Sequence, residues 1–299
     1  MVNTMYFPAT FRLVACVFLL SALSACSMNK MMVNMSLPLI DGGITAMNQE
    51  SDLQLAEDSM PANISMLNGM IHMDPENTQL QVYAAQAYYG LAYGFNEDRN
   101  VKRAETLYLR GLKHGLIALH QMGIEAATPE AIKKLNPDEL EKQLQKLDDD
   151  DVAALFWTAS NWAKWIDLNR DSAASLIQLP KPTAMMQRVL ELDETFYFGG
   201  AHMYFGVYYG SRAQMLGGNF ALAKEHFDNA REITNHQLLV ADLLQAQYLS
   251  RQMNDRDDFH QRLTKIIEAP EDLYPEATLL NQIVKRKAKL LLSKEEQWF

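Results

Sequence analysis

The chain has 299 residues, of which 48% are hydrophobic and 21% charged, with only 14 Gly and 10 Pro. That length suffices for one large or two ordinary domains, and so little Gly and Pro excludes collagen-like repeats and long flexible linkers. The formal net charge of -10 argues against nucleic-acid binding, which needs clustered Lys and Arg, and two cysteines cannot build a disulfide framework. Composition therefore predicts an acidic, globular, helical protein and leaves its function open.

Residues 1–25 have the pattern of a bacterial lipoprotein signal peptide. The apolar run Leu13–Leu23 is too short to span a membrane as a mature helix. It ends in Leu-Ser-Ala-Cys at residues 23–26, which resembles the lipobox of lipoprotein precursors. The resemblance implies cleavage before Cys26, acylation of that cysteine, and an anchor of several acyl chains in the envelope membrane. Because Ser27 rather than Asp follows, it further implies the periplasmic face of the outer membrane. The alternative is an ordinary secretory signal with a chance cysteine.

Residues 26–49 contain Pro38 and the pair Gly42-Gly43 and show no convincing helical period. We expect this segment to be the lipidated N-terminus and a tether. The folded domain is then expected to cover residues 50–299.

From residue 50 onward, helix-forming residues dominate and alternating β-branched residues are scarce. Breaks such as Asn136-Pro137 and Thr128-Pro129 combine a capping side chain with a proline suited to a first helical turn. The spacing predicts about ten to twelve helices of roughly 10–22 residues. The expected fold is all-α, a stack of helical hairpins.

The hairpins resemble tetratricopeptide repeats, in which small and aromatic residues recur at fixed offsets. The clearest copy covers Val207–Asn235, where Ala223, Phe227 and Ala230 should let a neighbouring helix approach and fill the gap. Ala104, Tyr108 and Gly111 repeat this spacing 119 positions earlier. The alternative is two unrelated amphipathic hairpins with Ala at a crossing point.

The segment Asp151–Asn169 is apolar over most of a helical circumference. Leu155, Ala159, Trp162 and Ile166 make one stripe, and further aromatic residues extend it. A helix of this kind is buried by partners on several sides, so we expect it at the centre of the fold. Its tryptophans either pack in the core or line a cavity.

Several stretches resemble the T-component of TRAP transporters, the TatT family of tetratricopeptide-like lipoproteins. The resemblance covers roughly residues 50–295 and is most specific in Gly199–Gly206 and the aromatic helix Trp157–Asn169. The other matching stretches are Met60–Asn63, Asp74–Asn77, Tyr93–Asp98, Leu216–Asn219 and Tyr248–Arg256. It implies a lipoprotein that forms a homotrimer, docks a periplasmic solute-binding protein and carries a channel through each protomer.

Catalytic motifs are absent from the sequence. It has no glycine-rich phosphate loop followed by Lys-Ser/Thr, no Gly-x-Ser-x-Gly elbow and no His-x-x-x-His pair. We therefore expect no enzyme activity, no cofactor and no metal. Asp148–Asp151 is expected to precede a helix and complement its dipole. The basic cluster Lys285–Lys287 with Lys289 is expected on a solvated helix face.

The sequence thus leaves two functions open. The first is a lipid-anchored accessory protein of a TRAP-type uptake system that binds a solute-binding protein and passes an organic or hydrophobic ligand. The second is a scaffold lipoprotein for an envelope assembly with no ligand path. Phenol and indole side chains suit a channel wall or partner groove, although the tyrosines could equally pack between helices and His202 could be a structural histidine. The candidate lining residues are Tyr88, Tyr89, Tyr93, Trp157, Trp162, Trp165, His202, Tyr204 and Tyr208.

Overall fold

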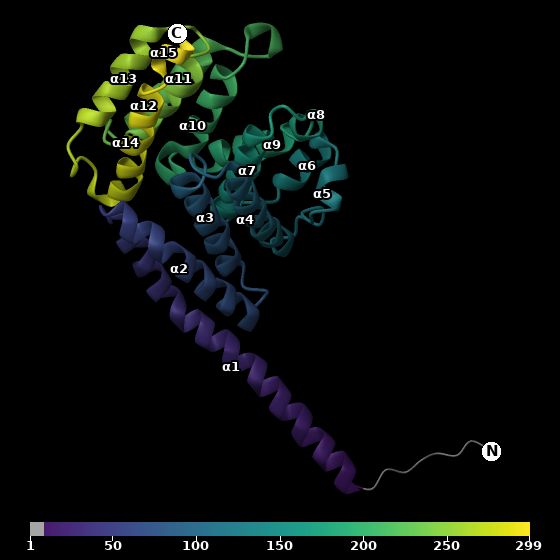
Figure 1. Cartoon of the computed structure of the whole chain (residues 1–299). Helices are drawn as coiled ribbons and strands as arrows, with labels where there is room; N and C mark the ends of the chain where they lie inside the picture. The colour runs from purple at the N-terminus through teal and green to yellow at the C-terminus, as the bar shows by residue number, and fades with distance from the viewer. Residues whose placement is uncertain (1–8) are drawn as a thin grey trace.

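The computed structural model describes the backbone of residues 9–299 and the side chains from residue 28 onward. Within this part of the chain helix follows helix and no strand forms, which confirms the all-α expectation (Figure 1). The predicted signal peptide (1–25) and Cys26 lie outside the residues whose side chains are described.

The longer helices form the body of the fold. They are α1 (Ala9–Asn48), α2 (Leu53–Met73), α3 (Thr78–Phe95), α4 (Val101–Gln121), α6 (Pro137–Leu144), α7 (Val152–Leu168), α9 (Pro180–Leu192), α10 (Phe196–Gly210), α11 (Phe220–Ile233), α13 (Arg256–Glu268) and α14 (Thr278–Leu292). The short elements are α5 (Ala131–Lys134), α8 (Ala173–Leu176), α12 (Val240–Leu244), the π-helix Gln245–Ser250, α15 (Glu295–Trp298) and the 3-10 turns Asp149–Asp151, Gln214–Leu216 and Pro275–Ala277.

The segment expected to be a tether is helical instead, because it belongs to α1. Val33, Leu37, Ile40 and Ile44 recur at spacings of four and three residues, a stripe that the sequence analysis overlooked. This stripe packs against α2 and α3, and Val33 is only 1% exposed. Burial of the stripe therefore keeps α1 helical although the helix contains two glycines and a proline. In Figure 1 this long helix projects from the body of the fold.

Helix starts follow the capping residues that the sequence suggested. The Asn136 side chain accepts a hydrogen bond from the backbone of Asp138, with Pro137 in the first turn. Asp148 caps the turn before α7 in a reciprocal capping box with Asp151, so the acidic run does precede a helix as expected.

The α10–α11 hairpin shows how the repeated small residues work. Ala223, Phe227 and Ala230 are buried between the two helices. A Cβ added at Gly206 would lie 2.6 Å from the Phe227 ring, and one at Gly210 would lie 3.4 Å from the Ala223 Cβ. The small residues Ala223 and Ala230 and the ring of Phe227 thus pack in the helix contact as predicted, and Gly206 and Gly210 of the facing helix, which were not predicted, also allow the close approach.

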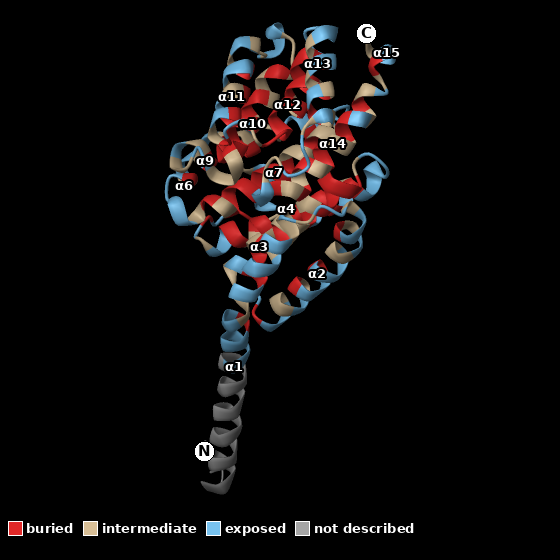
Figure 2. Cartoon of the chain, turned by 90° about the vertical axis from the view of Figure 1, so that its left-hand side faces the viewer, coloured by how far each residue is buried: buried red, intermediate tan, exposed pale blue. Residues whose placement is uncertain are grey.

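Helix α7 lies at the centre of the molecule, among the residues coloured as buried in Figure 2. It packs against α3, α4, α9 and α10. The predicted stripe is fully buried, with Leu155 and Ala159 at 0% exposure and Trp162 at 1%. A Cβ at Gly111 of α4 would meet the Asn161 side chain at 2.2 Å, so α4 reaches α7 through a glycine. The prediction of a central helix is confirmed.

Of the basic cluster on α14 only Lys289 is exposed as expected, and the other three side chains are not on a solvated face. Lys287 is 6% exposed and its ammonium lies 2.9 Å from the Asp98 carboxylate. Arg286 donates to the carbonyl oxygen of Gly94, and Lys285 donates to that of Ala269. Arg286 and Lys287 tie α14 to the end of α3, a long-range pairing that helix periodicity alone does not reveal, and Lys285 ties it to the end of α13.

Candidate functional site

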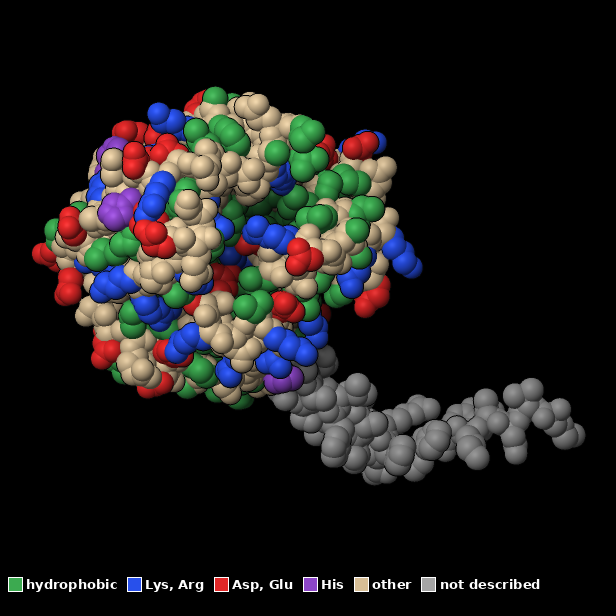
Figure 3. All heavy atoms as spheres, turned by 45° about the horizontal axis from the view of Figure 1, so that its top comes forward, with side chains coloured by type: hydrophobic (Ala, Val, Ile, Leu, Met, Phe, Trp, Pro, Cys, Tyr) green, Lys and Arg blue, Asp and Glu red, His purple; other side chains and the backbone are tan. Residues whose placement is uncertain are grey.

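A cavity of about 590 Å³ lies between the N-terminal helices and the C-terminal hairpins. Its wall is built from α1, α2, α3, α7, α8, α9, α10, α12, the π-helix and α14, and most lining side chains are apolar or aromatic. The space-filling view in Figure 3 shows a hollow in which Lys or Arg and Asp or Glu side chains lie at depth. A cavity of this size with a few polar groups is typical of a ligand-binding site.

Five of the residues predicted to line a channel are on this wall: Tyr89, Tyr93, Trp157, Tyr204 and Tyr208. The Tyr89 ring lies 5.4 Å from Trp157 and 5.9 Å from Tyr93, centroid to centroid. Tyr204 and Tyr208 stack at 6.1 Å on the α10 side. Aromatic rings from three helices therefore give the cavity wall apolar surface for a ligand.

The other four predicted lining residues do not line the cavity. Tyr88 stacks on an imidazole and its hydroxyl accepts a hydrogen bond from an amide at 3.1 Å. Trp162 is in the core, where its indole N–H donates to Gln178 at 3.2 Å. Trp165 packs between two core clusters. His202 is 4% exposed and its Nδ1 lies 3.0 Å from a second histidine nitrogen, that of His226.

A left-handed turn at the start of α10 shapes the wall. Tyr197, Phe198 and Gly199 have φ of 46°, 62° and 75°. Two non-glycine residues in this region are strained, so packing must hold them there. The Tyr197 ring lies 4.6 Å from Trp157 in the cavity wall, whereas the Phe198 ring packs 5.6 Å from Tyr274 in the C-terminal core. The two rings also contact each other, with centroids 5.4 Å apart, and this packing stabilises the turn.

Charged residues from distant parts of the chain meet at the cavity. The Lys164 ammonium on α7 lies 2.7 Å from the Glu97 carboxylate and 3.5 Å from that of Asp167. The Tyr248 hydroxyl on the π-helix donates to Asp167 at 2.7 Å, and Arg170 pairs with the same carboxylate. Lys164 and Asp167 line the cavity about one helical turn apart on α7, and Arg170 adds a third charge from the turn that follows this helix.

The environment keeps these ions charged and the phenols neutral at pH 7. Burial opposes the charged form of Lys164, but the Glu97, Tyr248 and Asp167 groups outweigh it and raise its pKa. The pKa of Asp167 is lowered because its cationic neighbours and the Tyr248 hydrogen bond outweigh the cost of burial. Burial raises the pKa of Tyr197 to about 12. The wall therefore offers fixed charges and neutral hydrogen-bond donors.

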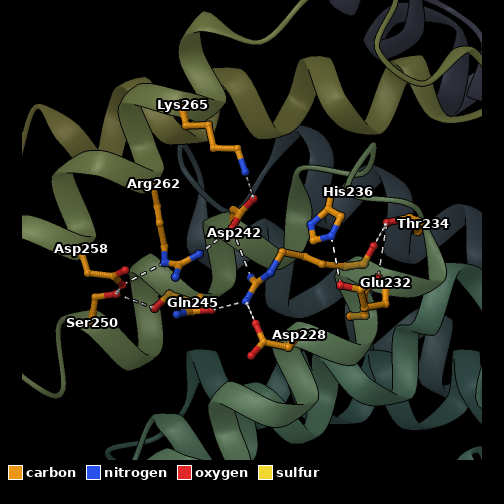
Figure 4. A network of polar contacts seen from close by, with 12 residues as sticks. Asp228, Glu232, Thr234, His236, Asp242, Gln245, Ser250, Asp258, Arg262 and Lys265 are labelled. Carbon is orange, nitrogen blue, oxygen red and sulfur yellow. Dashed lines mark hydrogen bonds and ion pairs between the residues drawn. The ribbon is translucent and has the colours of Figure 1, made fainter.

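The π-helix that carries Tyr248 is held from behind by a buried ion network, drawn in Figure 4. Asp242, 4% exposed, accepts from Arg231 at 3.1 Å and from Arg262 at 2.6 Å. Arg231 also donates to Gln245, the first residue of the π-helix, at 2.8 Å. This network joins α11, α12 and α13, so the position of Tyr248 depends on charges outside the cavity.

The sequence analysis missed the charged residues of the wall. Lys164, Asp167 and Arg170 recur every three residues at the end of the largely apolar helix α7 and just after it, and this pattern was a usable signal. Tyr248 and Arg212 had no comparable signal, since only the tertiary fold brings them to the cavity.

The described part of the chain has neither a metal-binding cluster nor a membrane-spanning helix. Within the described residues, no cluster of three or more His, Cys, Asp or Glu side chains is arranged to hold a metal ion. Over the same part of the chain, no helix is both long and apolar enough to cross a membrane.

Comparison with known proteins adds two findings. The sequence is 20% identical over 273 residues to an uncharacterized protein of Treponema pallidum (strain Nichols), covering 84% of this chain and 81% of that protein. The sequence pattern that defines the TRAP transporter T-component family matches residues 49–299, which is nearly the whole of the helical body and includes most of the cavity wall. The chain belongs to the TRAP transporter T-component family, an accessory component of a transport system rather than a family of enzymes.

Proposed function

We propose that this protein is a lipid-anchored, periplasm-facing accessory component of a TRAP uptake system, which binds the solute-binding protein and passes an organic or hydrophobic ligand through its cavity. The observation that carries the proposal is the cavity of about 590 Å³ between the N-terminal helices and the C-terminal hairpins, with its aromatic wall. A scaffold without a ligand path has no need of such a space, since protein interiors are normally filled by side chains.

An unpaired polar atom in the wall supports a ligand in this cavity. The Tyr93 hydroxyl is buried and finds no hydrogen-bond partner among the described residues. Burial raises the pKa of this phenol far above its usual range, so it stays a neutral donor. A buried hydroxyl without a partner costs free energy. A polar atom of a ligand or a water molecule would satisfy it.

The role of the cavity is tested by filling it. Ala163 on α7 lines the cavity, and a tryptophan there would occupy part of the space. Ala163→Trp should abolish ligand uptake by the reconstituted system while the protein still binds the solute-binding partner. Ala174→Trp, at an exposed position of α8 away from the wall, is the matched control. Normal uptake with Ala163→Trp would favour the scaffold function.

Association with the partner is tested separately. A pull-down with the native solute-binding protein should show binding at micromolar concentration, and its absence would contradict the adaptor role. We also propose a homotrimer, which sedimentation equilibrium of the purified protein should show as three times the protomer mass.

The membrane anchor is proposed from the lipobox at residues 23–26. Cys26→Ser removes the thiol that would carry the diacylglyceryl group, so the variant should move from the membrane fraction to the soluble periplasmic fraction. A variant that still pellets with membranes would contradict lipid anchoring.

A further inference from the structure

One basic residue of the cavity wall, Arg212, differs from the others in having no counter-ion. It follows α10, and its guanidinium lies over the Tyr208 ring, 3.8 Å from the ring centroid. Among the described residues no carboxylate pairs with Arg212, whereas Lys164 and Arg170 both pair with acidic groups. A guanidinium that lies over an aromatic face keeps its N–H donors, which lie in the guanidinium plane, free to bind another group.

The balance of charge on the wall is positive although the chain as a whole is acidic. The charged side chains that line the cavity in the described part of the protein are Lys164, Asp167, Arg170 and Arg212, three basic and one acidic. Glu97 pairs with Lys164 without lining the cavity. Together with Asp167, its negative charge balances the positive charges of Lys164 and Arg170. The uncompensated charge is therefore that of Arg212, in a chain with a formal net charge of -10.

The cavity wall beside Arg212 is aromatic. Tyr204 stacks on Tyr208 at 6.1 Å, and the Tyr204 hydroxyl shares a hydrogen bond of 2.6 Å with Thr183. Trp157 of α7 and Tyr89 of α3 add a second pair of aromatic rings to the same wall. A single cation beside a long apolar surface matches a molecule with one anionic end and an apolar body.

We propose that the ligand is a single-chain anionic amphiphile whose headgroup binds the Arg212 guanidinium and whose apolar body lies along the aromatic wall. This inference rests on the proposed function, because it assigns the ligand class of the same cavity. Carboxylate and phosphate headgroups both accept two parallel hydrogen bonds from a guanidinium, so the shared chemistry is the anionic group.

The test is titration calorimetry of the full protein with four probes that share a twelve-carbon chain: dodecanoate, dodecyl phosphate, dodecanol and dodecyltrimethylammonium. Wild-type protein should bind an anionic probe at least about tenfold more tightly than dodecanol, since a hydrogen bond to a charged group is lost with the alcohol. The cationic probe should bind most weakly. The tighter of the two anionic probes identifies the headgroup as carboxylate or phosphate.

Variants then assign the effect to Arg212. Arg212→Gln should remove the preference for the anionic probe and leave dodecanol binding within about twofold. Arg212→Lys keeps the charge and should keep most of the preference. Arg251→Gln is the matched control, because Arg251 also lies over an aromatic ring, 3.6 Å from the Trp298 centroid, but outside the cavity wall.

The outcomes separate this inference from the proposed function. Equal affinity of wild-type protein for dodecanol and both anionic probes, or an anionic preference that survives Arg212→Gln, would overturn the Arg212 site while the cavity still binds an apolar chain. No binding of any probe at millimolar concentration would overturn both the site and the proposed ligand path.

Discussion

Acidification from pH 7 to pH 4 should destabilise the folded protein through one buried histidine, His114 on α4. Its imidazole Nδ1 lies 2.7 Å from the Gln81 side-chain oxygen, and its ring stacks on Tyr88 at 5.6 Å. Burial, aided by the neighbouring Lys113 charge, lowers the pKa of His114 from 6.5 to about 4. The folded state therefore holds this histidine neutral at a pH where the unfolded chain binds a proton.

The sign and size of the effect follow from proton linkage. Above pH 6.5 neither state binds the proton, so His114 does not contribute to the pH dependence of stability. As the pH falls from 6.5 to about 4, the unfolded state is protonated first and gains free energy. At about 1.4 kcal/mol for each pH unit, the free energy of unfolding falls by about 3 kcal/mol across this window.

Urea unfolding of wild type and His114→Asn, measured at half-unit intervals from pH 8 to pH 4, isolates this contribution. The variant loses the ring stacking at every pH but has no imidazole to protonate. The stability advantage of wild type should therefore shrink by about 3 kcal/mol between pH 7 and pH 4. Lys113→Gln should reduce the shift only slightly, because burial is its main cause. Parallel stability curves for wild type and His114→Asn would refute the reasoning.

The remaining predictions concern packing and buried charge. Lys287→Ala removes the buried cation shared by Asp98 and by Glu97, which keeps its ion pair with Lys164, and should cost about 1–3 kcal/mol in urea unfolding. Lys289→Ala, at an exposed site of the same helix, should change stability by less than about 0.5 kcal/mol. Equal effects of the two would show that Lys287 is solvated. Gly206→Val places atoms within 2.6 Å of the Phe227 ring and should lower stability by at least about 1–3 kcal/mol. Gly69→Ala, in open space on α2, should instead raise stability by up to about 1 kcal/mol, and a loss there would contradict the helix propensity argument.

The sequence analysis succeeded where the signal was local. Helix starts came from capping residues such as Asn136, and the central position of α7 came from apolar side chains around most of its circumference. The close α10–α11 contact was visible as small residues around Phe227. In each case the residues that determine the structure lie within about two helical turns of one another, so a single-sequence pattern contains them.

The same local analysis failed where the determining partner is distant in the chain. The apolar stripe from Val33 to Ile44 in α1 was not predicted. Pro38 and the pair Gly42-Gly43 suggested a tether instead. Packing against α2 and α3 outweighs these weak helix breakers. The charge of Lys287 suggested a solvated face because its partners, Glu97 and Asp98, precede it by almost two hundred residues.

By itself, then, the sequence determined an all-α chain of hairpins around α7 and supplied the resemblance to the T-component family that the family comparison confirmed. Only the tertiary structure decided which aromatic residues face the cavity and which fill the core. Tyr88 and Tyr89 are adjacent on α3, yet only Tyr89 lines the wall. A helix has several apolar faces when it is buried all round, and the neighbouring helices determine which face borders the cavity. Arg212 is a second example: among the described residues no carboxylate pairs with it, because the positions of the acidic residues depend on the whole fold.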